Sequence, residues 1–146
     1  MDKPIITKQF RFEMAHMLEG HPGMCKNLHG HSYILEVSVS SNDDNDMIID
    51  FSELKHIVNK CIVDKLDHAF VYDSLSTDPC QTSIVDTLNK FSLKTFAFSG
   101  RPTAENMSKQ IYHIIDNEIK LSSCNISLVK VRLYETVTGW CDYQER

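Results

Sequence analysis

The sequence lacks the features that define several protein classes. It contains no apolar run near the roughly 20 residues of a membrane-spanning helix, and its first residues, Met1-Asp2-Lys3-Pro4, lack the apolar stretch of a secretory signal. Its 15 Lys and Arg against 20 Asp and Glu give a net charge of −5, whereas a protein that coats nucleic acid needs a basic face. With only 5 Gly and 4 Pro, it has no linker, repeat or low-complexity segment. These absences predict one globular domain, residues 1–146, that binds neither nucleic acid nor membrane.

The cysteines do not form a disulfide framework. There are five of them, an odd number, and no two are spaced as Cys-x-x-Cys. They predict reduced thiols and a cytoplasmic protein. Cys61 falls on the apolar face of a predicted helix, where a thiol behaves as a small hydrophobic side chain.

Alternation of apolar and polar residues predicts strands over 10–16, 31–40 and 128–135. Met47-Ile48-Ile49 is expected to start another strand after a polar turn, and a weaker pattern places a strand over 95–98. The loop between the first two strands, residues 17–28, contains Gly20, Pro22 and Gly23.

Apolar residues at helical spacing predict a helix that begins after Asp50 and ends near Asp67. Asp50 followed by Glu53 has the spacing of a capping box. A second helix is expected after Pro102, and a short one over 84–91. The prediction is an α+β fold, with a largely antiparallel four-stranded sheet and two helices on one face. Because one sheet face stays uncovered, we expect a barrel or an oligomer built through edge strands.

Histidine is concentrated in one part of the chain. Four of the seven histidines, His16, His21, His29 and His31, lie within residues 16–31. His29 and His31 share one face of an extended segment, because side chains two apart on a strand point the same way, and His16 ends the neighbouring strand. Three converging imidazoles suit Zn²⁺ and leave a fourth position for substrate or water. His21, in a Gly- and Pro-containing loop, is expected to be a loop residue.

Cys25 precedes His29 by four residues, and Gly30 allows close approach of the backbone to a ligand. Beside a cationic centre the thiolate form is favoured, so Cys25 could act as a base or nucleophile. The alternative is that Cys25 is a fourth zinc ligand, which would close the site and make it structural. Spacing alone leaves both possibilities open.

Two further carboxylates are candidate site residues. Asp67 precedes His68, and a neighbouring carboxylate can orient an imidazole, although this pair is also common at helix ends. Glu135 follows Val129, Val131 and Leu133 on one strand face, where a carboxylate is costly without a partner. That partner is either a buried Arg or Lys or a ligand with paired N–H donors.

These residues occur in the order of a known family. The matching segments are Phe12-Glu13-Met14-Ala15-His16, Cys25-Lys26-Asn27-Leu28-His29-Gly30-His31, Ile49-Asp50-Phe51, Leu66-Asp67-His68, Pro102-Thr103-Ala104-Glu105-Asn106 and Tyr134-Glu135-Thr136. Over nearly its whole length the chain resembles the 6-pyruvoyltetrahydropterin synthase and 6-carboxytetrahydropterin synthase family.

The resemblance implies the tunnelling fold (T-fold), whose copies form a barrel as a trimer, with trimers paired into hexamers. It implies Zn²⁺ bound by His16, His29 and His31. It implies that Cys25 is the base that abstracts a proton and that Asp67 and His68 form a proton relay. Glu135 would hold the 2-amino and N3 edge of the pterin, helped by Thr103 and Glu105.

The implied substrate is 7,8-dihydroneopterin triphosphate, and the family divides by product. The chain looks most like the bacterial branch of the queuosine pathway, which makes 6-carboxy-5,6,7,8-tetrahydropterin and releases acetaldehyde and triphosphate. The alternatives are 6-pyruvoyltetrahydropterin formation by triphosphate elimination, for tetrahydrobiopterin, and a non-enzymatic domain with a closed structural zinc site. Some members carry Glu in place of the catalytic Cys; Glu19 lies in the same loop here, and we expect it to be solvated.

Overall fold

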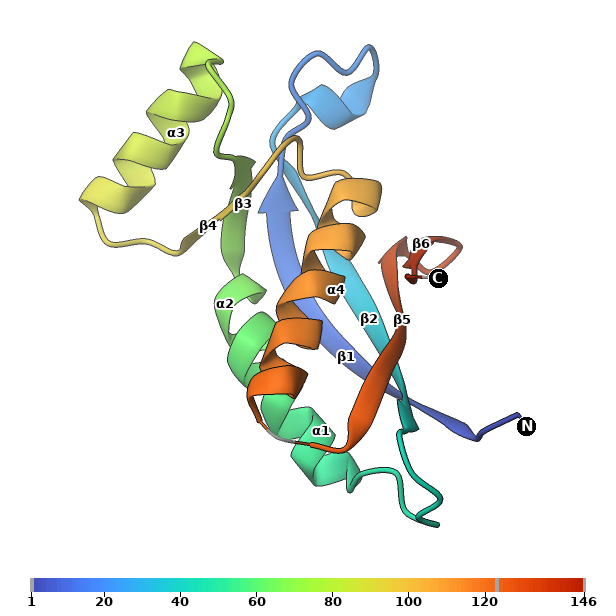
Figure 1. The fold of residues 1–146 in the computed structure, drawn as a ribbon. Helices are drawn as coiled ribbons and strands as arrows, with labels where there is room; N and C mark the ends of the chain where they lie inside the picture. The colour runs from blue at the N-terminus through green and yellow to red at the C-terminus, as the bar shows by residue number, and fades with distance from the viewer. Residues whose placement is uncertain (1, 123, 146) are drawn as a thin grey trace.

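The chain forms one six-stranded sheet with helices packed mainly on one face (Figure 1). The computed structural model describes residues 2–122 and 124–145. The strand order is β4-β3-β1-β2-β5-β6. The strands are β1 (Ile5–His16), β2 (His29–Ser41), β3 (Ala69–Asp73), β4 (Thr95–Phe98), β5 (Ile126–Thr136) and β6 (Gly139–Tyr143). The pairs β1–β2, β2–β5 and β5–β6 are antiparallel. The short strands β3 and β4 extend the sheet beside β1 through the parallel pairs β1–β3 and β3–β4.

Three helical regions accompany the sheet. The first is continuous and contains one π-helical segment; its parts are α1 (Phe51–Val58), η2 (Asn59–Val63) and α2 (Asp64–Leu66). The others are α3 (Pro79–Lys90) and α4 (Ala104–Leu121), and a short 3₁₀ turn, η1 (Met24–Lys26), lies between β1 and β2. In Figure 1, α4 runs along the sheet beside α1 and α2, whereas α3 lies apart, near β3 and β4. None of the helices in the described ranges has the length and apolar character needed to span a membrane.

The core lies between the sheet and the face formed by α1, α2 and α4. Alternate residues of β1 and β2 point into it, and the intervening polar residues face the other side of the sheet. The helical residues predicted to form the apolar face are buried: Leu54, Ile57, Val58, Cys61, Ile62 and Leu66. The central part of α4 buries Met107, Ile111, Ile115 and Ile119 against the same core.

The α+β prediction is confirmed, but the number of strands was wrong. The short β3 is almost entirely buried, so it lacks the alternation that marks a half-exposed strand. The edge strand β6 is short and contains no fully buried residue. The predicted largely antiparallel sheet therefore carries a parallel edge, and the third helix, α3, begins at Pro79 and not at residue 84.

Residues 47–49 do not form the predicted strand. They run as irregular chain into α1, with Ile49 buried and Ile48 packed against the core. Asp50 caps α1 as predicted, because its carboxylate accepts from the Ser52 N–H at 2.8 Å. The carboxylate of Glu53 instead accepts from the thiol of Cys124 at 3.3 Å.

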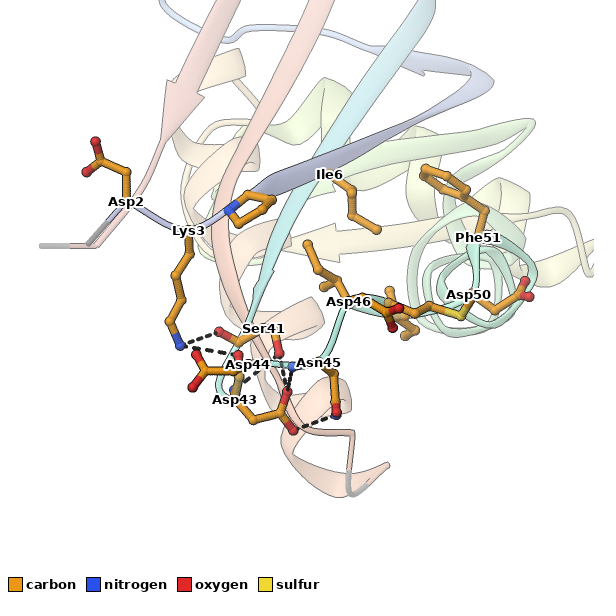
Figure 2. A pocket seen from close by; sticks show the side chains of 14 residues that line it. Asp2, Lys3, Ile6, Ser41, Asp43, Asp44, Asn45, Asp46, Asp50 and Phe51 are labelled. Atoms are coloured by element: carbon orange, nitrogen blue, oxygen red, sulfur yellow. Dashed lines mark hydrogen bonds between the residues drawn. The ribbon is translucent and has the colours of Figure 1, made fainter.

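A groove of about 640 Å³ lies beside this irregular segment, between residues 2–6 and 41–51 (Figure 2). Lys3 reaches across it and donates to the backbone carbonyls of Ser41 and Asp43, both at 3.4 Å. The groove is at the start of β1, whereas His16 is at its end. Its lining residues include no histidine or cysteine, so it does not supply the chemistry that the sequence predicts.

Replacement of Ile111 by alanine is expected to lower the free energy of unfolding by about 2–5 kcal/mol, because Ile111 is fully buried between α4 and the sheet. Denaturant unfolding of the variant measures the loss. Leu121→Ala, at the exposed end of the same helix, is the control and should change stability by less than about 0.5 kcal/mol. Equal losses in the two variants would contradict the packing described here.

Candidate metal centre and active site

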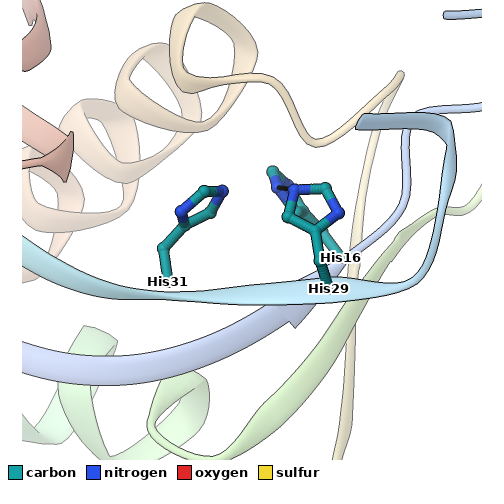
Figure 3. Close-up of side chains that lie close together, drawn as sticks. All are labelled: His16, His29 and His31. Carbon is teal, nitrogen blue, oxygen red and sulfur yellow. Dashed lines mark hydrogen bonds between the residues drawn. The ribbon is translucent and has the colours of Figure 1, made fainter. Parts of the chain in front are cut away.

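Three histidines converge at one end of the two central strands (Figure 3). The β1–β2 register places His16 opposite His29, and His31 two residues farther along the same face of β2. One ring nitrogen of each histidine lies within 4.8 Å of a ring nitrogen of each of the other two. Gly30, between the last two, lies close to β1, since a Cβ there would meet the Met14 carbonyl oxygen at 3.2 Å. The glycine thus serves the close pairing of two strands.

Hydrogen bonds fix which nitrogen of two imidazoles faces the centre. His16 Nδ1 donates to the Pro102 carbonyl oxygen at 2.9 Å, and His29 Nδ1 donates to the Asn27 carbonyl oxygen at 2.6 Å. A carbonyl only accepts, so each ring carries its proton on Nδ1 and presents a bare Nε2. These two Nε2 atoms lie 3.1 Å apart.

The third imidazole has a buried atom with no partner. His31 Nε2 has no hydrogen-bond partner among the described residues. Desolvation by burial lowers the pKa of both His16 and His31, so both rings are neutral at neutral pH and keep a lone pair to donate. Two imidazoles whose Nδ1 atoms bond to backbone carbonyls, and a third with a buried, unpartnered Nε2 among the described residues, are a donor set that fits a divalent metal ion such as Zn²⁺.

The carboxylate of Glu135 lies beside two of these nitrogens. Its Oε1 is 3.5 Å from His16 Nε2 and 3.8 Å from His31 Nε2. Leu133 and Val131 precede it on the core face, whereas Val129 is displaced by a bulge in β5. Among the described residues, the partners of the Glu135 carboxylate are therefore imidazoles, and neither arginine nor lysine pairs with it.

Tyr33 is a site residue that the sequence reasoning missed. It continues the face of β2 that carries His29 and His31, it is 1% exposed, and its ring lies edge-on to His31 at 5.6 Å between centroids. Burial raises its pKa, and the nearby Glu135 and Cys25 raise it further. Its position two residues after His31 is the signal that could have identified it.

Cys25 lies in the short turn η1, in the loop that joins the two histidine-bearing strands. The Leu18 N–H donates to its carbonyl oxygen at 3.0 Å, which ties the loop to the end of β1. That loop follows His16 and leads into His29, so Cys25 is placed between the ends of the two strands that carry the cluster. The group of mutually close ligand atoms in residues 2–122 and 124–145 contains the three histidines and no cysteine.

Asp67 and His68 form a pair between α2 and β3. Asp67 Oδ1 accepts from His68 Nδ1 at 3.0 Å and from the Glu13 N–H at 2.9 Å. That Glu13 hydrogen bond and the adjacent imidazole lower the pKa of Asp67. His68 has a left-handed φ of 64°, uncommon without glycine, and its side chain is 76% exposed.

His68 lines a depression of about 650 Å³ with Ser32, Lys94 and His31, one of the three clustered histidines. Ser32 donates to the Glu13 carboxylate at 2.7 Å on the sheet face opposite the helices. Within the described part of the chain, no hydrogen bond or ion pair joins His68 to Cys25 or to the histidine cluster.

The start of α4 lies next to the cluster through the hydrogen bond between Pro102 and His16. Thr103 caps α4 by accepting from the Asn106 N–H at 3.2 Å. Glu105 is exposed in the first turn, so its carboxylate is free to meet a ligand.

Two loop residues had been expected to lie outside the site. His21 is a loop residue as predicted, and its Nδ1 accepts from the Gly23 N–H at 2.9 Å. Glu19 is not solvated as predicted: it is half-buried, and its carboxylate accepts from the Ser76 hydroxyl at 2.8 Å. This bond links the loop after β1 to the loop after β3.

Comparisons with known proteins agree with the site and the fold. A family model described as 6-pyruvoyl tetrahydropterin synthase matches residues 5–146. The chain is 43% identical over 145 residues to a Haemophilus influenzae protein named 6-carboxy-5,6,7,8-tetrahydropterin synthase, covering 96% of this chain and 98% of that protein. An Aquifex aeolicus protein of the same name is 32% identical over 160 residues, covering 96% and 97%.

Solved structures show the same fold. An uncharacterized protein from Wolinella succinogenes superposes with a TM-score of 0.82 at 18% identity over 100% of both chains. The 6-pyruvoyl tetrahydropterin synthase of Plasmodium falciparum gives 0.71 at 18% identity over 98% of each chain. By the extent of the family match and the identity to its bacterial relatives, the chain belongs to the 6-pyruvoyl tetrahydropterin synthase family.

Proposed function

We propose that the protein is a zinc-dependent 6-carboxy-5,6,7,8-tetrahydropterin synthase. It would convert 7,8-dihydroneopterin triphosphate with release of acetaldehyde and triphosphate, a step towards queuosine in the cytoplasm. The observation that carries the proposal is near-full-length similarity to two bacterial proteins of that name, 43% and 32% identical. The convergent imidazoles supply the matching chemistry.

His16, His29 and His31 would hold the metal ion through their Nε2 atoms. When bound, Zn²⁺ would supply Lewis acidity to oxygens of the substrate side chain, which makes the adjacent C–H bonds more acidic. The hydrogen bonds from Nδ1 of His16 and His29 keep both rings oriented for this task.

Cys25 would take the proton from the side-chain carbon next to the pterin ring, since it lies in the loop that joins the strands carrying His16 and His29. Asp67 would hold His68 by Nδ1, which leaves Nε2 to receive or return a proton. The exposed position of this pair supports its action on a substrate held largely by another copy of the chain.

The pterin ring needs a carboxylate at its 2-amino and N3 edge, which is remote from the reacting side chain. Glu105 suits this role, since it is exposed at the start of α4, next to Thr103. Glu135 suits the pterin-binding role less well than the sequence suggested. Its carboxylate is within 4 Å of two imidazoles that would hold the metal ion, which would bind the reacting side chain of the substrate and not its pterin ring. A homo-oligomer, trimer or hexamer, would bring Cys25 and His68 of different copies together.

The closed structural zinc site receives no support from the geometry, since the cluster of described ligand atoms includes no cysteine.

Zinc-loaded protein incubated with 7,8-dihydroneopterin triphosphate is expected to yield 6-carboxy-5,6,7,8-tetrahydropterin, acetaldehyde and triphosphate. Mass spectrometry identifies the pterin, and an aldehyde-trapping reagent detects the acetaldehyde. A pyruvoyl product without acetaldehyde would assign the protein to the other branch, and unchanged substrate would refute the enzymatic proposal.

A further inference from the structure

The strand face that carries the metal-binding imidazoles ends in two side chains that no proposed step above uses. Glu135 is on β5 and Tyr33 is on β2, the strand that pairs with it. The hydroxyl of Tyr33 lies deep in the core, and the Glu135 side chain is only 31% exposed. A carboxylate and a phenol held this close to a metal site need partners of their own.

The position of Glu135 matches an empty corner of a four-coordinate site. Ligand atoms at zinc–nitrogen distances of about 2.0–2.1 Å occupy tetrahedral corners roughly 3.3–3.4 Å apart. The observed separations are 3.1 Å between the Nε2 atoms of His16 and His29, 3.5 Å between His16 Nε2 and Glu135 Oε1, and 3.8 Å between His31 Nε2 and the same oxygen. Three of the edges of a tetrahedron are therefore already close to their required length.

The tetrahedron is not closed on its remaining side. Within the described residues, the group of ligand atoms within 4.8 Å of one another holds the three histidines and leaves Glu135 out. The carboxylate thus lies against His16 and His31 and away from His29. A rotation of its side chain would bring it onto an ion held by the three histidines, and the reverse rotation would free that corner for a substrate oxygen.

Tyr33 provides the group that holds the carboxylate there. Its hydroxyl is 3.5 Å from His16 Nδ1, but that nitrogen already donates its proton to the Pro102 carbonyl and has no lone pair to offer. The Tyr33 hydroxyl and the Glu135 carboxylate each lie 3.5 Å from a nitrogen of the His16 ring, so the phenol proton is available to Glu135. The Tyr33 ring is 1% exposed and stacked on Phe12 at 5.7 Å between centroids.

We propose that Glu135, held by the hydroxyl of Tyr33, is a displaceable fourth ligand that completes the metal site until the substrate side chain replaces it. The inference rests on the proposed function for the identity of the incoming ligand. It makes Glu135 a metal ligand and Tyr33 a positioning residue. It accounts for a carboxylate beside two neutral imidazoles and for a buried phenol in the same place.

The test measures metal binding without turnover. Metal-free protein is titrated with Co²⁺, whose visible absorption is intense at four-coordinate sites and weaker at higher coordination, and zinc affinity is measured by competition with a chelator. Glu135→Gln and Glu135→Ala are expected to change the Co²⁺ spectrum and to weaken zinc binding about 10- to 100-fold, and Tyr33→Phe should weaken it about tenfold.

Matched controls separate this role from general damage. Tyr112→Phe removes another buried hydroxyl, one that donates to the Leu128 carbonyl oxygen at 3.2 Å, and Glu36→Gln removes a carboxylate on the opposite sheet face; both should bind Co²⁺ as the wild type does. Addition of 7,8-dihydroneopterin should change the wild-type spectrum and bring wild type and Glu135→Gln to the same final spectrum.

Identical Co²⁺ spectra and zinc affinities for wild type and both Glu135 variants would overturn the proposal. So would a Tyr33→Phe variant that matches Tyr112→Phe. Neither result bears on the product assay, so a failure here is distinguishable from a failure of the proposed enzymatic function.

Discussion

His29→Ala is expected to lose zinc at concentrations that saturate the wild type and to lose all measurable turnover. The side chain contributes one of three imidazole nitrogens, and its ring is oriented by the Asn27 carbonyl. Loss of an outer partner of a ligand already costs about 10- to 100-fold in metal affinity, so loss of a ligand should cost more. Metal content by elemental analysis and binding by competition with a chelator measure the effect.

Stability provides a second readout of the same change. A metal ion that binds only the folded chain stabilises it by about 2.7 kcal/mol at 100 times the dissociation constant. Zinc should therefore raise the denaturation midpoint of the wild type and leave that of His29→Ala unchanged. His21→Ala, in the same loop region but with its ring turned to the Gly23 N–H, is the control and should retain the zinc-dependent shift. A full zinc response in His29→Ala would remove this residue from the site.

The metal cluster could be predicted from sequence because its geometry depends on local rules. Spacing by two places His29 and His31 on one face of a strand, and a single hairpin register brings His16 opposite. Part of the core could be predicted for the same reason, because the apolar residues after Asp50 recur at helical spacing and so identify the buried face of that helix. These features depend on residues near in sequence or on one strand pairing.

What could not be predicted depends on long-range pairing or on burial without periodicity. Strand β3 is buried on both faces and so lacks alternation, and β6 is a five-residue edge strand without a fully buried residue, so its pattern is too short and weak to identify. The place of Glu135 beside His16 follows from a β2–β5 pairing across about 100 residues of sequence and from a bulge in β5. The linkage of Glu19 to Ser76 joins two loops whose proximity only the fold defines.

Cys25 and His68 are joined by no hydrogen bond or ion pair within the described residues, and variants of the two can test whether they act from different copies of the chain. Cys25→Ala and His68→Ala are each expected to lower turnover by roughly 10²–10⁴-fold, because each removes a group that moves a proton. Both should keep zinc, since neither side chain is among the clustered ligand atoms. If Cys25 of one copy acts with His68 of another, hetero-oligomers of the two inactive variants will contain some intact sites.

The expected recovery can be calculated for random assembly. Equal amounts of the two variants, mixed by co-expression, should regain about a quarter of wild-type activity per site, because each half of a shared site is intact with a probability of about one half. As a control, Cys25→Ala is mixed with a double variant that carries both Asp67→Ala and His68→Ala. This mixture should recover equally well, since Asp67 and His68 belong to the same half of the site. A mixture of His68→Ala with Asp67→Ala should stay inactive for the same reason. No recovery in the first mixture, with mixed oligomers demonstrated by mass spectrometry, would show that Cys25 and His68 act within one chain and that the exposed pair must move to reach the cluster.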